Sequence, residues 1–261
     1  MLLRKLAMKK HRLREGLTLI EGVRALRTAL DAGIPVEIIL ADEDFLGDPI
    51  AAALVARAEE SGALVLPAAR EVVESAASVA TPQGFVAAGR VPRFELADVL
   101  SAEDPGMPGP ELVLIADRIS DPGNLGALIR SAAALGASGY VTTPGTVDAF
   151  SPRVVRASAA TVFSAPGAEG VEPGHLLDEL RRRGYSVVAS SPDSDRELDG
   201  YEPPSRIALL VGEEGSGLSP NMLDSADVVL RIPMVPAAES LNVASASAIF
   251  LHAFSPLRRN G

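Results

Sequence analysis

The feature that most restricts the fold of this chain is a buried strand that leads directly into a helix. The strand is ELVLIA (111–116), a continuous apolar run, which is typical of a strand with both faces covered. The helix is GNLGALIRSAAALGA (123–137), whose apolar residues follow a helical period. Together they predict the first half of a βα unit.

The second half of the chain repeats this alternation. Three further apolar runs have the length of strands, namely YSVVAS (185–190), RIALLVG (206–212) and DVVLRIPM (227–234). Helices are predicted from Ser151-Pro152, up to Gly184 and over 241–254. This order favours an α/β fold with a mostly parallel sheet that is covered on both faces. Because ligands bind beyond the carboxyl ends of such strands, we expect the site at the turns after residues 116, 211 and 232.

The first 90 residues alternate in the same way and are followed by a break in composition. Short strands are predicted at LTLIEG (17–22), VEIIL (36–40) and ALVLP (63–67), with helices that end at Gly33 and Gly62. Four prolines then lie between residues 89 and 110, which is typical of a linker. We therefore expect an N-terminal domain over 1–92, a linker over 93–110 and a C-terminal domain over 111–261.

Several classes of protein are disfavoured by what the sequence lacks. The chain has no cysteine, so disulfides and thiolate metal sites are excluded, and we expect a cytoplasmic protein. Its three histidines are too scattered to have metal-ligand spacing, so no metal site is expected. Phosphate-binding, nucleophile-elbow and zinc-protease motifs are missing. No apolar stretch approaches the roughly 18 residues of a membrane span, so no membrane association is expected.

Charge is distributed unevenly along the chain. The net charge is −10, which disfavours non-specific coating of nucleic acid. The first 16 residues are nevertheless basic, and they form either a solubilising helix or an arm that contacts an RNA or DNA backbone. Aromatic residues make up only 4% of the chain. Recognition of a structured RNA by its backbone and shape is therefore favoured over base stacking.

Three segments have residue types that suit a site, and each also has an ordinary structural interpretation. The turn GEEGSG (212–217) either brings its backbone close to a ligand or simply reverses the chain. Its two carboxylates would repel a pyrophosphate and suit an uncharged or cationic ligand. Arg130 interrupts an apolar helical stretch, and it either faces an anion or lies in solvent. Ser240 or Asn242 can act as the cap of the last helix.

Taken in order and with their intervals, three segments resemble the motifs of the SpoU-type (TrmH-like) RNA 2′-O-ribose methyltransferases of the SPOUT class. They are DPGNLGALIRSAAALGA, LLVGEEGSGLSP and RIPMVPAAESLNVASASA, and the match covers about 111–254. HRLREGLTLIEGVRALRTALDAG and TPQGFVA are similar to the substrate-binding domain that precedes the catalytic domain in ribosomal-RNA members. Pro236 departs from the family, which usually has glycine there, and this concerns the loop around the cofactor.

The resemblance implies an S-adenosylmethionine-dependent homodimer with a SPOUT-type α/β-knot catalytic domain. This domain has a C-terminal trefoil knot and a mostly parallel sheet, and a small α/β ribosomal-protein-like domain that binds RNA precedes it. The implied catalytic residues are Asn124, Arg130, Glu213, Ser240 and Asn242. The implied cofactor-binding residues are Leu210, Val211, Gly212, Ile232, Ser240 and Leu241. The expected RNA contacts are Arg4, Lys9, Lys10, Arg12, Arg130, Arg153 and Arg156, which a dimer can gather with Arg118 on one face.

The expected reaction is attack of a ribose 2′-hydroxyl on the sulfonium methyl group, with catalysis largely by orientation. In this family, removal of the 2′-hydroxyl proton is often assigned to the arginine that corresponds to Arg130. A guanidinium, however, remains protonated at pH 7 and is a poor base. We therefore expect Arg130 to hold the adjacent phosphate. The resemblance also implies that Glu213 anchors Asn124. In an ideal helix, Asn124 and Arg130 lie about 240° apart. They converge only if Asn124 belongs to the loop.

The expected substrate is ribosomal RNA, most specifically 23S rRNA. The alternatives within the family are a transfer-RNA 2′-O-methyltransferase and a catalytically silent RNA-binding protein of the same fold. A nucleotide-dependent oxidoreductase is disfavoured, because no glycine fingerprint follows the first strand of the second domain.

Overall fold

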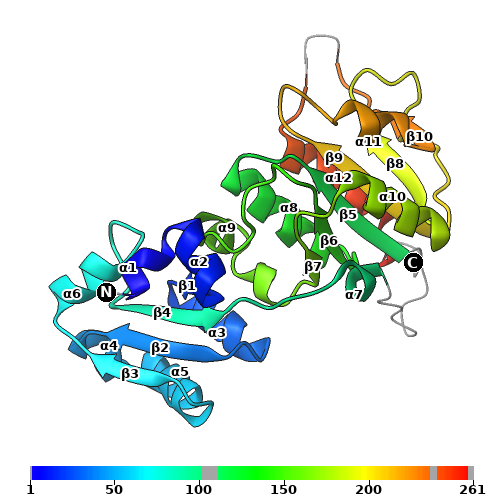
Figure 1. Cartoon of the computed structure of the whole chain (residues 1–261). Coiled ribbons are helices and arrows are strands. Elements are labelled where there is room, and N and C mark those ends of the chain that lie inside the picture. Colours follow the sequence, from blue (N-terminus) through cyan, green and yellow to red (C-terminus); the bar gives the residue numbers. More distant parts are fainter. Residues whose placement is uncertain (1, 101–110, 236–239, 258–261) are drawn as a thin grey trace. The chain divides into compact units, whose positions relative to one another are not determined.

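The computed structural model describes residues 2–100, 111–235 and 240–257, and its backbone contacts divide the chain into two compact units (Figure 1). Unit 1 comprises Met1–Pro92 and Asp148–Ser164, and unit 2 comprises Arg93–Val147 and Ala165–Gly261. The expected boundary at residue 92 therefore coincides with the end of one segment, but 148–164 also belongs to unit 1. The sequence analysis did not anticipate this second segment.

Unit 1 is built on a four-stranded mixed sheet in the order β1-β4-β2-β3. Its strands are β1 (Leu17–Ile20), β2 (Val36–Ala41), β3 (Leu64–Pro67) and β4 (Phe85–Arg90). β4 is antiparallel to both β1 and β2, whereas β2 and β3 are parallel. The three expected strands are present, and β4 was missed, although it lies within and just after the TPQGFVA segment.

Helices cover the sheet of unit 1. They are α1 (Leu2–Leu6), α2 (Lys9–Glu15), α3 (Val23–Asp31), α4 (Glu43–Gly47), α5 (Pro49–Glu60) and α6 (Arg70–Ala76). The side chains of Leu3, Leu6 and Val73 join one core cluster with those of β1, β2 and β4. The second segment adds α9 (Pro152–Ala157) and the short 3₁₀ helix η1 (Thr161–Phe163), which contact β1 and α3 respectively.

Unit 2 contains a six-stranded sheet in the order β10-β8-β9-β5-β6-β7, in which all neighbouring strands are parallel. The strands are β5 (Glu111–Asp117), β6 (Gly139–Thr142), β7 (Gly167–Ala168), β8 (Ser186–Ser190), β9 (Arg206–Gly212) and β10 (Val228–Leu230). The parallel sheet predicted from the sequence is confirmed. Its short strands β6 and β7 carried too little apolar sequence to be predicted.

Both faces of this sheet are covered. On one face, α7 (Leu96–Leu100), α10 (Pro173–Arg182) and α11 (Pro220–Asp224) contribute to one core with alternate residues of β5, β8 and β9. On the other, α8 (Pro122–Ala134) and α12 (Val243–Phe254) pack against each other and against β5 and β9 (Figure 1). The helix α7 lies within the expected linker, whose residues 101–110 are outside the described part of the chain.

Candidate active site

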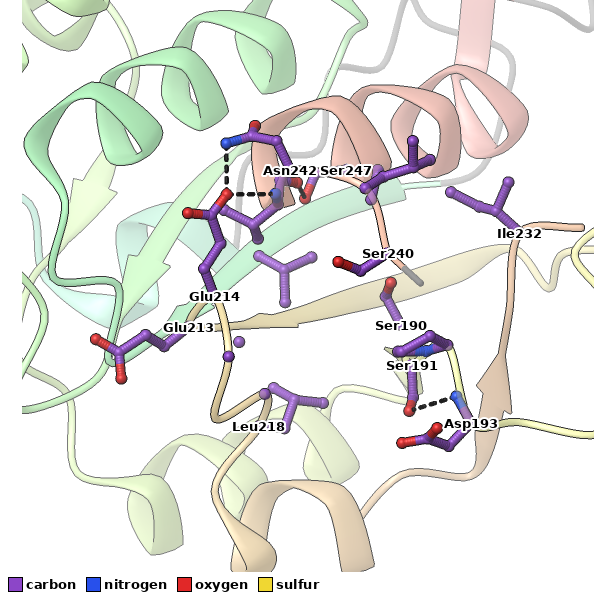
Figure 2. Close-up of a pocket in the computed structure, with 18 of the residues that line it drawn as sticks. Ser190, Ser191, Asp193, Glu213, Glu214, Leu218, Ile232, Ser240, Asn242 and Ser247 are labelled. Carbon is purple, nitrogen blue, oxygen red and sulfur yellow. Dashed lines mark hydrogen bonds between the residues drawn. The ribbon is translucent and has the colours of Figure 1, made fainter. Parts of the chain in front are cut away.

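A pocket of about 610 Å³ opens at the carboxyl ends of three adjacent strands of unit 2. Its walls come from the turns that follow β8, β9 and β10 and from the start of α12 (Figure 2). Turns after parallel strands converge at one edge of the sheet, which is why segments distant in sequence meet here. Of the three turns singled out from the sequence, those after residues 211 and 232 line this pocket. The turn after residue 116 does not.

The glycine-rich loop after β9 is held by backbone approach and by left-handed conformations. A Cβ on Gly212 would lie 2.3 Å from the backbone carbon of Gly217 and the nitrogen of Leu218. Gly215 and Gly217 have φ values of 88° and 65°, which glycine adopts without steric cost. The Gly217 N–H donates to the Glu213 carbonyl and closes the loop. Both interpretations of this segment therefore apply, since it is a tight turn and it lines a pocket.

Asn242 joins two helix starts to the loop after β9. Its Oδ1 accepts from the backbone N–H groups of Ala244 and Ser245, so it caps α12 as expected. Its Nδ2 donates to Oδ1 of Asn124, at 3.0 Å, and to Oε1 of Glu214. Figure 2 shows Glu214 pointing toward Asn242 across the mouth of the loop. Asn124 and Asn242, both predicted site residues, are therefore in direct contact.

The expectation that Glu213 anchors Asn124 does not match this geometry. The Glu213 carboxylate accepts from the Ser216 hydroxyl at 2.9 Å, and in Figure 2 its side chain points away from Glu214 and Asn242. Hydrogen bonds from Ser120 and Ser216, together with the charge of Arg118, lower the pKa of Glu213 below its ordinary value. The backbone turns at Glu214, whose carboxylate accepts from Asn242, so a glutamate reaches Asn124 only indirectly, through Asn242.

Arg130 lies apart from the pocket lining. Asp121 caps α8 through the backbone N–H of Asn124, so Asn124 is already in the first helical turn. The condition for Asn124 and Arg130 to converge within one chain is thus not met. Arg130 is exposed on α8 and makes no hydrogen bond or ion pair with the described residues. The interpretation as an arginine in solvent describes its position in a single chain.

The expected cofactor residues line the pocket with one exception. Val211, Gly212, Ile232, Ser240 and Leu241 all belong to its wall. Leu210 is not among the lining residues. Its side chain is buried in the core of unit 2 with Ala208 and Ala189, whereas the expected contact was with its backbone. Residues 236–239, and with them the departure at Pro236, lie outside the described residues.

Sequence reasoning missed one wall of the pocket. This wall is formed by the last residue of β8, Ser190, and the three residues after it, Ser191, Pro192 and Asp193. Figure 2 shows Ser190, Ser191 and Asp193 facing the glycine-rich loop. The run YSVVAS was recognised as a strand, and the rule that ligands bind beyond strand ends applied to it equally. Asp193 adds a third carboxylate to those of Glu213 and Glu214, and the described lining contains no Lys, Arg or His.

Unit 1 presents most, but not all, of the basic side chains expected to contact RNA. Arg4, Lys9, Lys10 and Arg153 are exposed. Arg12 is a correction, because its side chain is only 5% exposed and forms an ion pair with Asp148 of the second segment. It also donates to the carbonyl oxygens of Leu6 and Ala7. A guanidinium enclosed in this way stabilises unit 1 and has no free face for a phosphate.

Arg156 is also engaged, although less completely. Its Nη1 lies 2.9 Å from the carboxylate of Glu21 and 2.8 Å from the Ser78 hydroxyl. Its side chain keeps 34% of its surface exposed. Arg156 therefore ties the second segment of unit 1 to the first while one side of its guanidinium faces solvent.

Metal-ligand clusters and membrane-spanning helices are both absent from the described residues. Within residues 2–100, 111–235 and 240–257, no group of three or more His, Asp or Glu side chains is placed to hold a metal ion. In the same part of the chain, no helix has both the length and the apolar character needed to span a membrane.

Unit 2 combines a parallel α/β sheet, a pocket beyond the carboxyl ends of its strands and a cluster formed by Asn124, Asn242 and Glu214. These features fit a ligand-binding α/β enzyme domain. Residues 111–252 match the profile of the SpoU rRNA methylase family, and residues 1–87 match that of the MRM3-like substrate-binding domain. The chain belongs to the SpoU rRNA methylase family. The resemblance inferred from the three motifs is thus confirmed.

Individual relatives extend over nearly the whole chain. The 23S rRNA (guanosine(2553)-2′-O)-methyltransferase RlmP of Bacillus subtilis is 30% identical over 95% of this chain and 92% of its own length. The crystal structure of the SpoU methyltransferase AviRb from Streptomyces viridochromogenes, in complex with AdoMet, superposes with a TM-score of 0.88 at 27% identity, covering 100% of this chain and 97% of AviRb. An AdoMet-bound rRNA methyltransferase from Sinorhizobium meliloti gives 0.84 at 30% identity, covering 99% and 93%.

Proposed function

We propose that this chain transfers the methyl group of S-adenosylmethionine to a ribose 2′-hydroxyl of 23S ribosomal RNA. Membership of the SpoU rRNA methylase family supports the reaction, and the named activity of RlmP supports the substrate. The observation that carries the proposal is the contact of Asn242 with Asn124 and Glu214 beside the pocket at the ends of β8, β9 and β10. The proposed place of action is the cytoplasm.

The pocket suits the proposed cofactor in size and charge. Its volume of about 610 Å³ lies within the range of roughly 300–1,000 Å³ that small-molecule sites occupy. Apolar side chains of Leu218, Ile232 and Leu241 offer surface to an adenine ring. The carboxylates of Asp193 and Glu214 at the rim attract the positive sulfonium and ammonium groups of the cofactor. The backbone of Gly212 leaves no room for a side chain, which keeps the loop closed against this wall.

When bound, the cofactor supplies an activated methyl group on a sulfonium, so the remaining task is to place the ribose hydroxyl in line with it. The residues of this chain do this by holding one another rigidly. Glu214 fixes the amide of Asn242, and Asn242 in turn fixes Oδ1 of Asn124. This leaves the Nδ2 of Asn124, which has no hydrogen-bond partner among the described residues, to donate to the substrate. In Figure 2, Ser240 lies across the mouth of the pocket from Glu214.

The proposed working form is a homodimer, because Arg130 cannot join the site of its own chain. Arg130 lies about 240° around α8 from Asn124, on an exposed face. Small residues surround it on that face, and Ile249 of the adjacent helix α12 is 42% exposed. A second copy that covers this face brings its Arg130 to the first copy's pocket, where a guanidinium can hold a phosphate in bidentate fashion. The trefoil knot implied by the family resemblance remains part of this proposal.

Unit 1 is proposed to hold the ribosomal RNA. Its exposed cations at Arg4, Lys9, Lys10 and Arg153 supply phosphate contacts without requiring a particular base sequence. With few aromatic residues available, recognition rests on the shape of a folded RNA element.

The test is methyl transfer from labelled S-adenosylmethionine to unmodified 23S rRNA, with 16S rRNA and bulk transfer RNA in parallel. We expect label only in 23S rRNA, and alkali-resistant at one position, because a 2′-O-methyl group blocks cleavage of its own phosphodiester. Label in transfer RNA would show that the substrate is transfer RNA and not 23S rRNA. Cofactor binding without transfer to any RNA would overturn the enzymatic assignment. Mixing Arg130→Ala with Asn242→Ala protein tests the dimer, since restored activity requires two copies to share one site.

A further inference from the structure

Arg118 is held in a backbone conformation that its side chain makes unfavourable. It follows β5 directly and has φ of 56°, in the left-handed region where a Cβ crowds the carbonyl oxygen. Glycine or asparagine would adopt this conformation more easily. Its backbone N–H donates to Oγ1 of Thr143 at 3.1 Å, which fixes the conformation from the neighbouring strand end. Residues held in such strained positions cluster at functional sites.

Among the described residues, only weak contacts hold the guanidinium of Arg118. Nη2 makes a long hydrogen bond of 3.3 Å to the Gly217 carbonyl, and Nε lies 3.5 Å from Oδ2 of Asp117. That carboxylate is already used, because Oδ1 accepts from the Thr143 hydroxyl at 2.6 Å and Oδ2 from the Ser219 N–H at 2.7 Å. The Nε of Arg118 is buried and has no hydrogen-bond partner in the described structure. The side chain as a whole is 38% exposed.

The position of this guanidinium is beside the proposed reaction site. It contacts Gly217 of the glycine-rich loop, which forms the pocket wall. Its charge reaches the Glu213 carboxylate, which Ser120 also contacts from the turn after β5. Arg118 therefore stands on the outer side of the same loop whose inner side faces the cofactor pocket, with donors left over for an anion.

We propose that Arg118 binds a phosphate of the RNA strand next to the ribose that is methylated. This inference rests on the proposed function, because a ribose within an RNA strand has a phosphate on each side, so that one remains for Arg118 when Arg130 holds the other. A planar guanidinium with several free N–H donors matches two phosphate oxygens at once. The contact with Gly217 makes the same side chain a link between the bound strand and the loop at the cofactor pocket.

The test uses a substitution that relieves the backbone strain while it removes the charge. Arg118→Gly is expected to weaken binding of unmodified 23S rRNA about tenfold, the loss of one charge-assisted contact. The slope of log affinity against log salt should fall by about 1. Affinity for S-adenosylmethionine should stay within about twofold. The midpoint of thermal unfolding should change little, because relief of the left-handed φ offsets the lost Gly217 contact and the greater freedom of glycine in the unfolded chain. Arg118→Lys keeps the charge without the bidentate geometry and should recover part of the RNA affinity.

Arg182→Gln is the matched control, because Arg182 is an exposed arginine of the same unit that pairs with Glu179 on α10. It removes one positive charge and should leave RNA affinity near that of the wild type. Unchanged RNA affinity in Arg118→Gly would overturn the proposal, and so would a parallel loss of cofactor affinity, which would make Arg118 a brace for the loop. Methylation by the wild type, measured in the same experiment, separates these outcomes from failure of the proposed function.

Discussion

Nδ2 of Asn242 lies 3.0 Å from Oδ1 of Asn124, although 118 residues separate them in the chain. The same side chain caps α12 and contacts Glu214. One amide thus connects the first turn of α8, the start of α12 and the loop after β9. Each of these three contacts uses a different atom pair, so substitutions can remove some of them and keep others.

Asn242→Ser is expected to separate the stabilising role of Asn242 from its role at the site. Serine retains a capping oxygen for α12 but has no amide to reach Asn124. We expect methyl transfer to fall more than about tenfold, the effect of misplacing a positioning group. The unfolding midpoint should remain close to that of the wild type. Thermal melts and initial rates with 23S rRNA measure the two effects.

Asn242→Ala is the companion variant, because it removes the cap as well. It should lose about 0.5–2 kcal/mol of stability in addition to activity. If the serine variant were as unstable as the alanine variant, or fully active, the division of roles would be wrong.

Gly212→Ala is expected to damage the cofactor pocket through steric overlap. The new methyl group would lie 2.3 Å from backbone atoms of Gly217 and Leu218, which cannot move without opening the loop. We expect affinity for S-adenosylmethionine to fall more than about tenfold, as in other sites where preorganisation is lost. Isothermal titration calorimetry measures it.

Gly215→Ala is the control for this prediction. Its Cβ would meet nothing within 4 Å, but its φ is 88°, so the cost is conformational, about 1 kcal/mol. We expect lower stability with cofactor affinity largely kept. Equal loss of affinity in the two variants would show that loop flexibility, and not the close approach at Gly212, shapes the pocket.

The pocket shows most clearly how much of the site could be predicted from the sequence. The apolar runs of β5, β8 and β9 predicted strands, and the turns after residues 211 and 232 predicted two walls of the site. The contact between Asn124 and Asn242 was expected only as shared membership of one pocket. The strand-end rule applied equally to Ser190–Asp193, so this third wall was within reach of sequence reasoning.

The remaining differences arise from information that a linear pattern does not contain. Glu213 and Glu214 are identical in type and adjacent, and only the path of the loop decides which one meets Asn242. Arg12 lies in a basic run, yet its partner Asp148 is 136 residues away. Charge patterns predict exposure, but long-range pairing overrides them.

The stability contributed by Glu213 is expected to disappear in acid. Its pKa lies below the ordinary 4.5, chiefly because Ser120 and Ser216 donate to the carboxylate. A carboxyl whose pKa is lowered by folding stabilises the native state above its unfolded pKa, and this contribution is lost as the pH falls through the folded pKa. Wild type should therefore melt above Glu213→Gln from pH 5 to 8, and the two midpoints should converge below about pH 4.5. A difference that stays constant as the pH falls below 4.5 would contradict this assignment.

Asp148→Ala is expected to destabilise the protein strongly, because it leaves the enclosed guanidinium of Arg12 without its counter-charge. The side chains of Arg12 and Asp148 are 5% and 11% exposed, and loss of one partner of such a pair costs about 3–5 kcal/mol. Urea unfolding measures this loss.

Asp31→Ala is the matched control for an exposed pair. Its partner Arg57 is 47% exposed and Asp31 57%, so the cost should be at most about 1 kcal/mol. Comparable losses in the two variants would contradict the role given to Arg12.

Lys10→Gln, by contrast, should weaken RNA binding with little effect on unfolding.

The segment Asp148–Ser164 makes the substrate-binding part of this protein a discontinuous object. Thr18 of β1 donates to the carbonyl of Phe150, and Arg12 needs Asp148. Excision at residue 92 would therefore yield a fragment that lacks pieces of its own interior. A simple fusion of the N-terminal domain of one relative to the C-terminal domain of another would meet the same obstacle. The grafted domain would also need a matching segment in place of residues 148–164.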